Sequence, residues 1–473
     1  MFGSGNVHYE VGGNTEAMSF GGIAPVHRLV TKLGLRSKID SELDLLKVHL
    51  PYHESDHVLN IAYNVMCGGT RLEDIERLRH DVAYMNALGA DLIPDPTTAG
   101  DFTRRFSEQD VVRLMESINA VRPQLWRGRG AELLGPITYM DVDGTIAPTT
   151  GKCKKGMDIS YKGIWGYAPL IVSVANTKEV LYVVNRSGNA PSHQGAAKWI
   201  DMGLEHLRAH APRICIRGDT DFSLTEHFDR WAETVDFLFG MDCNAALRTR
   251  AEALSEGCWS RLERKPKYET LTGATRERYQ DNEKERIVKE REYLNLHLNF
   301  EDVAEFEYQP GKCSRPYRVV ALRKNISKMK GEQVLFDEIR YFFYITTRTD
   351  LTAAEVVYCA NERCDQENVI EQLKNGVNAL RVPLYDLVSN WAYMVMAALA
   401  WNIKSWFAMM MHLKSDRDAY IRMEFRRFIN SMILIPCCVM RRARSIVVRL
   451  IGYQPTLDRL FSVWNNIERA GFT

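Results

Sequence analysis

A switch in hydrophobic periodicity near Pro136 limits the folds that this chain can adopt. The stretch ITYMDVDG (137–144) alternates apolar and polar side chains and is rich in strand formers. Strand-like runs follow at 166–176 and 179–186, and a helical pattern covers about 193–210. RICIRGD, a short helix and VDFLFGM (235–241) complete the series. The pattern of three strands, helix, strand, helix and strand predicts an α/β fold with a mixed sheet.

Two aspartates end strands in this pattern. Asp143 closes the first strand in Asp-Gly-Thr, and Asp219 closes the fourth in Gly-Asp-Thr-Asp-Phe. The strand order is that of an RNase H-like sheet, in which the first and fourth strands are neighbours. We therefore expect both carboxylates at the same edge of the sheet. Asp141 lies on the same face as Asp143 and is expected to accept a hydrogen bond behind it.

The stretch 351–376 is predicted to form one helix. Thr352 and Glu355 form a Thr-x-x-Glu capping box at its start. Asn375 and Gly376 supply a usual helix end.

Arg363, Glu367 and Lys374 share a narrow stripe of this helix, because they are four and seven residues apart. A carboxylate between two cations can also be an ordinary row of solvent-exposed ion pairs along a helix. Glu371 lies one turn beyond Glu367, and helix geometry alone does not choose between them. If Glu367 packs against the edge that carries Asp143 and Asp219, the three carboxylates repel one another unless cations are present.

Three such carboxylates imply hard divalent metal ions with oxygen ligands. We expect Asp143, Asp219 and Glu367 to bind two Mg²⁺ ions, for which Mn²⁺ can substitute. Two such ions roughly 4 Å apart activate a water or a 3′-hydroxyl and stabilise the leaving oxygen in in-line phosphoryl transfer.

The pattern Arg363-x3-Glu367-x6-Lys374 resembles the glutamate helix of DDE transposases from bacterial insertion sequences. The family pattern is Tyr-x2-Arg-x3-Glu-x6-Lys, and this chain has Ala360 at the tyrosine position, with Tyr358 two residues earlier. The motifs around the two aspartates and the insertion that precedes the helix extend the resemblance over most of the chain. It selects Glu367 over its neighbour as the third catalytic carboxylate. It also implies that Arg363 and Lys374 contact DNA phosphates.

The resemblance implies cut-and-paste DNA transposition. The expected partners are terminal inverted repeats, target DNA and a second copy of the chain, because synapsis requires at least a homodimer. The net charge of +1 gives no global indication of a nucleic-acid partner, so basic residues must act locally. Arg104 and Arg105 fall in a predicted short helix that would meet DNA in a helix-turn-helix unit. Basic residues in the C-terminal region include Arg441, Arg442 and Arg444.

The predicted organisation is a split catalytic core between helical flanks. An inserted, largely β module separates the second aspartate strand from the glutamate helix. The predicted regions are a flexible N-terminus (1–15), a helical DNA-binding region (16–130), the first part of the core (131–241), the β-rich insertion (242–338), the second part of the core (339–411) and a helical basic C-terminal region (412–473).

Membrane and secreted classes are not expected. The N-terminus has no apolar signal segment, and the most apolar run, 391–401, is too short to span a bilayer. The ten cysteines show no metal-ligand spacing and are expected to be reduced and mostly buried. We expect a bacterial cytoplasmic protein associated with the nucleoid.

Two other functions fit parts of the sequence. MDVDGT also resembles the nucleophile motif of haloacid-dehalogenase-type phosphatases, in which Asp141 would be the nucleophile and Asp143 the general acid. That function leaves the stripe of Arg363, Glu367 and Lys374 unexplained. A DNA-binding protein that keeps the fold without the reaction is the other alternative, and the presence of all three carboxylates argues against it.

Overall fold

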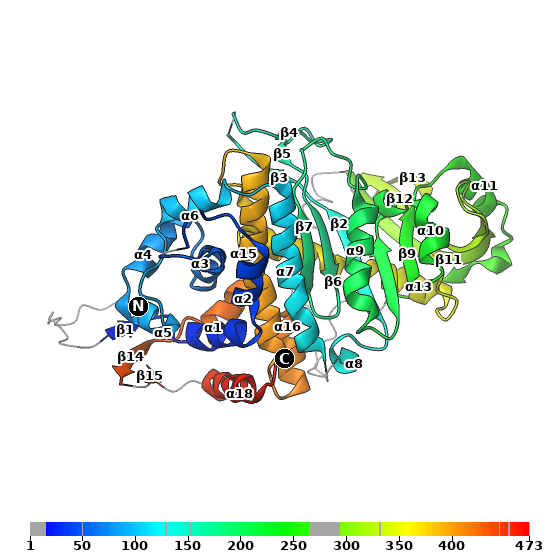
Figure 1. The fold of residues 1–473 in the computed structure, drawn as a ribbon. Coiled ribbons are helices and arrows are strands. Elements are labelled where there is room, and N and C mark those ends of the chain that lie inside the picture. The colour runs from blue at the N-terminus through cyan, green and yellow to red at the C-terminus, as the bar shows by residue number, and fades with distance from the viewer. Residues whose placement is uncertain are drawn as a thin grey trace.

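The computed structural model describes residues 16–49, 51–127, 130–151, 153–264, 294–330, 333–443, 445–452 and 455–472. A large mixed sheet lies at its centre, with helices on both faces (Figure 1). The strands of this sheet are β2 (Thr138–Gly144), β6 (Leu170–Val174), β7 (Glu179–Val184), β8 (Ile214–Gly218), β9 (Asp236–Met241), β10 (Ser260–Arg261), β11 (Leu294–Tyr308), β12 (Tyr317–Lys330) and β13 (Gln333–Thr346).

The order across the described part of this sheet is β10-β11-β12-β13-β9-β8-β2-β6-β7. β2 runs parallel to β8, and β8 runs parallel to β9. β6 is antiparallel to β2, and β7 is antiparallel to β6. β13 is antiparallel to β9, so the long strands expected as an insertion continue the central sheet. The expected boundary between residues 338 and 339 falls inside β13, and residues 265–293 of the expected insertion lie outside the described residues.

One strand expected from the sequence is divided in two. The run 166–176 forms β5 (Trp165–Tyr167) and β6, with Ala168 and Pro169 between them. β5 leaves the large sheet and pairs with β3 (Ala147–Pro148) and β4 (Asp158–Ile159) in a small sheet. Proline lacks the amide hydrogen that a continuous strand would need.

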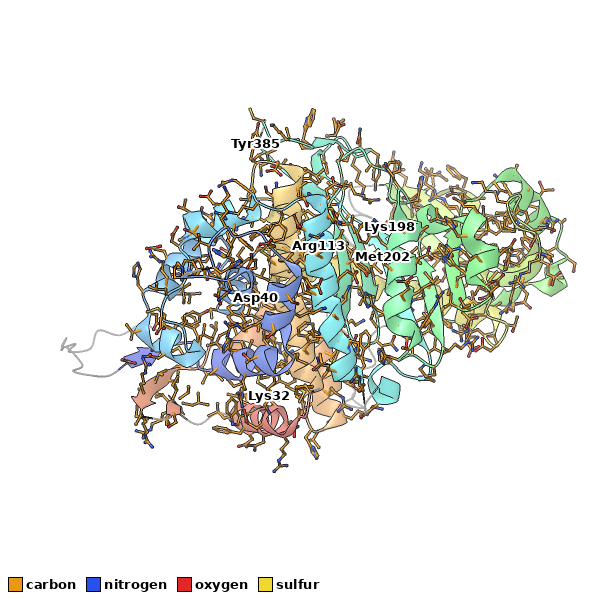
Figure 2. All side chains as sticks on the ribbon, in the orientation of Figure 1. Lys32, Asp40, Arg113, Lys198, Met202 and Tyr385 are labelled. Carbon is orange, nitrogen blue, oxygen red and sulfur yellow. The ribbon has the colours of Figure 1, made fainter. Side chains whose placement is uncertain are left out.

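Helices cover both faces of the central sheet. Figure 2 labels Lys198 and Met202 on α9, and this helix contacts β6, β7 and β8. The opposite face is covered by α13, which packs on Cys215 and Leu238. The helices after β2 are α9 (Ala196–Arg208), α10 (Thr225–Trp231), α11 (Ala245–Glu252), α13 (Ala353–Asn361), α14 (Cys364–Glu371), α15 (Leu387–Met409), α16 (Lys414–Arg422), α17 (Phe425–Met432) and α18 (Thr456–Arg469).

α15 is the expected buried helix around 391–401, and it packs along the edge strand β7. Its side chains satisfy backbone groups there, as when Asn402 accepts a hydrogen bond from the Val180 amide at 2.8 Å. Glu179 on β7 is fully buried and binds Arg122 at 2.6 Å and the Trp406 indole at 2.7 Å. A buried carboxylate requires such partners, so this ion pair fastens the N-terminal helices to the sheet. Among the described residues, no helix meets the length and hydrophobicity needed to span a membrane.

The N-terminal region is helical as expected, but the C-terminal region is only partly so. Residues of the basic C-terminal region form a hairpin of β14 (Cys437–Arg442) and β15 (Ser445–Leu450), which pairs with β1 (Glu16–Met18). Alternating burial along β14 shows that its apolar side packs on the helices. The N-terminal helices are α1 (Ile23–Lys32), α2 (Leu35–Glu42), α3 (Glu54–Met66), α4 (Ile75–Arg79), α5 (Val82–Leu88), α6 (Pro96–Thr103), α7 (Glu108–Trp126) and α8 (Gly130–Leu133).

Buried histidines in the N-terminal helices predict a loss of stability in acid. His57 on α3 stacks on Phe102 at 4.4 Å between ring centroids, and burial lowers its pKa to about 4. Below pH 6.5 the unfolded chain binds a proton that folded His57 does not bind until about pH 4. The free energy of unfolding should therefore fall by about 2 kcal/mol from this group between pH 7 and 4.5. Urea unfolding at both pH values should show a smaller fall for His57→Phe than for the wild type. An equal fall in both proteins would contradict the prediction.

Candidate active site

Asp143 and Asp219 lie at the ends of two adjacent parallel strands. β2 and β8 pair in a register that sets Asp141 opposite Arg217, so Asp143 and Asp219 follow two residues further along each chain. Asp143 accepts a hydrogen bond from the Gly144 amide at 2.8 Å. Alternation along the strands places these side chains on the face that α13 covers.

The backbone after β8 turns sharply to present Asp219. A short 3-10 helix (η2, Thr220–Phe222) begins here, and Asp219 caps it by accepting a hydrogen bond from the Asp221 amide at 3.0 Å. A Cβ at Gly218 would lie 2.8 Å from the Phe222 Cβ, so the turn requires glycine. This requirement explains the Gly-Asp-Thr-Asp-Phe motif.

Asp141 is buried and held by a bidentate ion pair. Its two carboxylate oxygens accept hydrogen bonds from Arg217 Nε at 2.7 Å and Nη2 at 3.0 Å. The Arg217 guanidinium also lies over the Tyr139 ring, 4.3 Å from its centroid. A nucleophile must reach a phosphate from solvent, and Asp141 has no solvent exposure. This environment does not support the phosphatase function that MDVDGT suggested.

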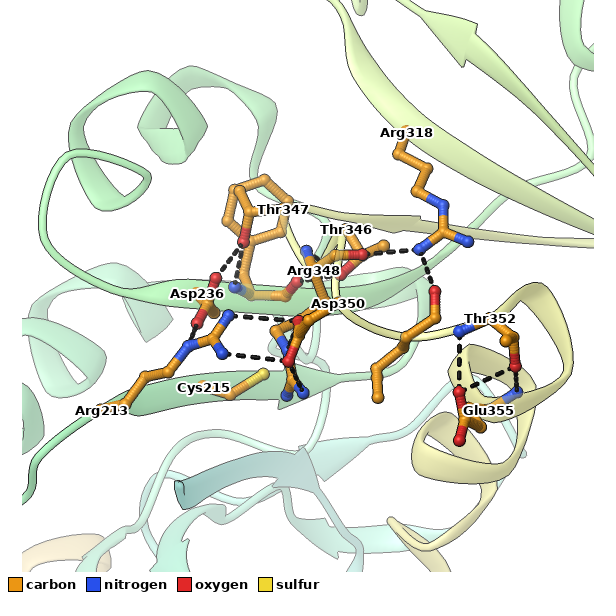
Figure 3. A network of polar contacts seen from close by, with 12 residues as sticks. Arg213, Cys215, Asp236, Arg318, Thr346, Thr347, Arg348, Asp350, Thr352 and Glu355 are labelled. Atoms are coloured by element: carbon orange, nitrogen blue, oxygen red, sulfur yellow. Dashed lines mark hydrogen bonds and ion pairs between the residues drawn. The ribbon is translucent and has the colours of Figure 1, made fainter. Parts of the chain in front are cut away.

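The segment between β13 and α13 is fixed by a polar network, which Figure 3 shows. Asp350 accepts hydrogen bonds from both Arg213 and Arg348, and the pKa of Asp350 is lowered mainly by Arg348. The expected capping box is present, because Thr352 Oγ1 accepts a hydrogen bond from the Glu355 amide while Glu355 accepts one from the Thr352 amide. The network determines where α13 begins relative to the sheet.

The prediction of a single helix over 351–376 is wrong in one respect, because the helix is interrupted between α13 and α14. In a continuous helix the Cys359 carbonyl would accept from the Arg363 amide. Here the Arg363 amide bonds to Ala360 at 3.3 Å, and the Cys359 carbonyl accepts from Arg217 Nη1 at 3.0 Å. A π-turn (η4, Gln372–Gly376) follows α14, and Asn378 rather than Gly376 adopts the left-handed conformation.

α14 carries Glu367 and is anchored by its neighbour Gln366. The Gln366 side chain is buried and accepts a hydrogen bond from the Ser173 hydroxyl on β6. Glu367 itself is exposed. The Tyr358 hydroxyl donates a hydrogen bond to the carbonyl of Glu263. Tyr358, the tyrosine nearest to the family position, is therefore bound to the segment that follows β10.

The three expected carboxylates act on one another electrostatically. Burial is the largest cause that raises the pKa of Asp143 to about 6. Arg363 opposes this rise through an ion pair of 3.1 Å between its Nη1 and Asp143 Oδ2. The carboxylates of Asp219 and Glu367 add to it. Burial also raises the pKa of Asp219, and Arg363 again opposes the shift.

Lys374 interacts electrostatically with Asp143, as Arg363 and Glu367 do. Burial lowers the pKa of Lys374, Glu371 raises it, Lys162 lowers it and Asp143 raises it. Lys374 lines a cavity of about 390 Å³ that begins at Gly144, directly after Asp143 on the chain. Of the three stripe residues, Arg363 contacts Asp143 directly, and Lys374 lines the adjoining cavity.

The other expected DNA-contacting residues lie elsewhere. Arg104 and Arg105 follow the end of α6 and are not part of a helix, which corrects the expectation. Arg104 pairs with Asp101 and Arg105 donates to the Leu45 carbonyl at 3.3 Å. Arg441 and Arg442 are exposed at the end of strand β14, and the third arginine of that cluster, Arg444, lies outside the described residues.

A different set of potential metal ligands is compact in the described part of the chain. The ligand atoms of Asp44, His49 and Glu54 lie within 4.8 Å of one another. Glu54 already accepts hydrogen bonds from the Leu45 and Leu46 amides at 2.9 and 3.0 Å. These hydrogen bonds indicate that Glu54 anchors the loop before α3.

Two more carboxylates lie near Asp219: Asp221, within the Gly-Asp-Thr-Asp-Phe motif, and Asp242, which no motif marks. Asp221 and Asp242 both raise the pKa of Asp219, which shows that they lie close to it. Asp242 directly follows β9, as Asp219 directly follows β8. The same strand-end argument that found Asp219 could have found Asp242.

Comparisons with known proteins identify the family. A structure described as a piggyBac transposase synaptic complex with hairpin DNA is similar to 88% of this chain and 81% of its own, with 9% sequence identity and a TM-score of 0.39. A comparison with curated proteins found no match. The model of the family described as transposase DDE domain group 1 matches residues 3–472. This match spans nearly the whole chain, which therefore belongs to the DDE transposase family.

Proposed function

We propose that the chain is a transposase that cleaves DNA at the terminal inverted repeats of a bacterial insertion sequence and transfers the ends to target DNA. The observation that carries the proposal is that Arg363, Asp219 and Glu367 all act electrostatically on the buried carboxylate of Asp143. The strand order β7-β6-β2-β8-β9, with β6 antiparallel and β8 and β9 parallel to β2, supports an RNase H-like core.

The carboxylates around Asp143 fit divalent metal ions. Carboxylate oxygens are the ligands that Mg²⁺ and Mn²⁺ prefer, and the raised pKa of Asp143 reflects burial and neighbouring negative charge that a cation would relieve. Asp143, Asp219 and Glu367 would hold two such ions. When bound, they supply an activated hydroxyl and stabilise the leaving oxygen.

The chain's own cations have a positioning role in this proposal. Arg363 sits against Asp143 and Lys374 lines the adjoining cavity, so both can bind phosphates of a strand that enters there. Holding the DNA end in line for attack would raise the rate as well as the affinity. Arg217 and Asp141 would fix the strands and α13 beneath them.

The remaining assignments extend the proposal to partners. Exposed Arg441 and Arg442 would add affinity through counterion release, and the helical region 16–130 with Arg104 and Arg105 would bind the repeats. Synapsis of two ends would require a homodimer or larger oligomer. Such a protein would work on the nucleoid in the bacterial cytoplasm.

Metal removal tests the proposed reaction. The purified chain should nick a labelled duplex that carries the end of its own element when Mg²⁺ or Mn²⁺ is present. Excess EDTA should abolish nicking, and added Mg²⁺ should restore it, because the carboxylates act through bound metal. A duplex of scrambled end sequence is the control. Nicking that persists in EDTA, or that ignores the end sequence, would refute the proposal.

A further inference from the structure

The cavity beside Asp143 carries positive charge without a carboxylate among its described lining residues. Three cationic side chains line it, Lys162, Arg186 and Lys374. The hydroxyl-bearing residues Thr145 and Ser192 line it as well. Its volume of about 390 Å³ falls in the range of small-ligand sites.

The charge of Arg186 is held by neutral groups. Its Nε donates to the Ala168 carbonyl at 2.9 Å, and its Nη1 donates to the carbonyls of Ser192 and Gln194, each at 2.9 Å, and of Pro191 at 3.2 Å. Its Nη2 is buried and has no hydrogen-bond acceptor among the described residues. Burial lowers the pKa of Arg186 to about 10, which shows that no nearby carboxylate offsets the cost of its charge. An anion in the cavity would supply that compensation.

Lys162 is presented by a tight turn of the small sheet. β4 and β5 pair antiparallel, and the Ser160 amide donates to the Ile164 carbonyl at 2.9 Å. Gly163 has φ +73°, a conformation that favours glycine. The turn lies at one end of the large sheet (Figure 1), near Tyr385 in Figure 2.

An aromatic side chain stands on the same turn. Tyr161 is 85% exposed, and the Lys162 ammonium lies 5.3 Å from its ring centroid. Trp165 on β5 is 53% exposed. Tyr161 in particular gains little stability from burial. Next to a cationic cavity, an exposed ring is suited to stack on a nucleic-acid base.

We propose that this cavity holds the phosphate of an unpaired nucleotide and that its base stacks on Tyr161. The site rests on the proposed function, because the cavity opens beside Asp143 and the same DNA strand would pass both. Lys162, Arg186 and Lys374 supply the charge, and the aromatic ring selects a base that is free of its partner strand. A duplex keeps its bases stacked internally and cannot use the ring.

Binding of oligothymidylate tests the site. Fluorescence anisotropy in EDTA would compare wild type with Tyr161→Ala, Tyr161→Phe and Lys162→Ala, and with Lys414→Ala as an exposed lysine control on α16. Tyr161→Ala should bind the single strand about tenfold more weakly, since stacking of one base is lost. Tyr161→Phe keeps the ring and should bind like wild type. Lys162→Ala should reduce the salt slope by roughly 0.7.

Two further probes distinguish base stacking from simple phosphate binding. Affinity for the element-end duplex should change less than that for the single strand in Tyr161→Ala. If Tyr161→Ala binds oligothymidylate like wild type, or if wild type does not bind it, the proposal is overturned. Displacement of the strand by inorganic phosphate with no dependence on Tyr161 would also overturn it, because the cavity would then be a free-phosphate site. Nicking of the element end in Mg²⁺ reports on the proposed function separately.

Discussion

Removing the charge of Glu367, Asp143 or Asp219 should abolish DNA cleavage. The matched changes are Glu367→Gln, Asp143→Asn and Asp219→Asn. Each keeps the size of the side chain but replaces a negatively charged carboxylate, which can bind metal, with a neutral amide. Loss of one member of a catalytic set commonly costs as much as loss of the whole set, so cleavage should fall by about a thousandfold or more. Affinity for the element-end duplex should change little, because it comes mainly from Lys and Arg contacts with phosphates. Single-turnover nicking in Mg²⁺ and anisotropy in EDTA measure the two quantities.

Glu371→Gln is the matched control for this prediction. Glu371 lies one turn beyond Glu367 and its Oε1 accepts from Asn375 Nδ2 at 2.5 Å, so its loss should leave cleavage unchanged. If Glu371→Gln is inactive and Glu367→Gln is active, the assignment of the third carboxylate is wrong. Unfolding is not expected to cause the loss of cleavage in Asp143→Asn. Because the pKa of Asp143 is raised to about 6, its ionised form already destabilises the fold at higher pH.

The central sheet was predictable because its strands are short runs rich in strand formers, and the first of them alternates. Apolar side chains of β2 and β8 pack on one face, while Asp141, Asp143, Arg217 and Asp219 share the other. Strand ends also marked the candidate carboxylates, since a polar residue that follows a buried strand must be placed at a sheet edge. Asp242 obeys the same rule but belongs to no family motif, so the resemblance does not mark it.

The interruption of the helix at Glu362 and Arg363 could not be predicted from local sequence. Nothing between Thr352 and Gly376 is a strong helix breaker, and both helix ends have ordinary capping residues. The break depends on Arg217, which bonds to the Cys359 carbonyl from a strand far earlier in the chain. Tertiary contacts of this kind override local helix propensity.

The C-terminal hairpin was missed for a different reason. Val439 and Val447 are β-branched and lie in short apolar runs on either side of an arginine-rich turn, a pattern that is compatible with two strands. The dense arginines indicate a charged segment, and the helical pattern before them favours a continued helix. The pairing of β14 with β1, which lies near the opposite end of the chain, stabilises the hairpin and is invisible to local periodicity.

The ion pair between Asp141 and Arg217 should be essential for stability, because both side chains are almost fully buried. The exposed fractions are 0% for Asp141 and 3% for Arg217. Removing one partner leaves an uncompensated buried charge, so Asp141→Asn and Arg217→Met should each lower the free energy of unfolding by about 3–5 kcal/mol. Urea unfolding at neutral pH measures this. The exposed pair of Arg230 and Asp201 is the control, and Arg230→Met should cost at most about 1 kcal/mol.

The double variant Asp141→Asn with Arg217→Met decides whether buried charge is the cause. It removes both charges, so its loss of stability should be well below the sum of the two single losses. Its cleavage should nevertheless stay slow, because Arg217→Met also removes the hydrogen bond to the Cys359 carbonyl at the interruption between α13 and α14. Additive losses of stability would show that packing, and not charge, dominates. If a folded double variant cleaves at the wild-type rate, the hydrogen bond from Arg217 is not needed to position α14.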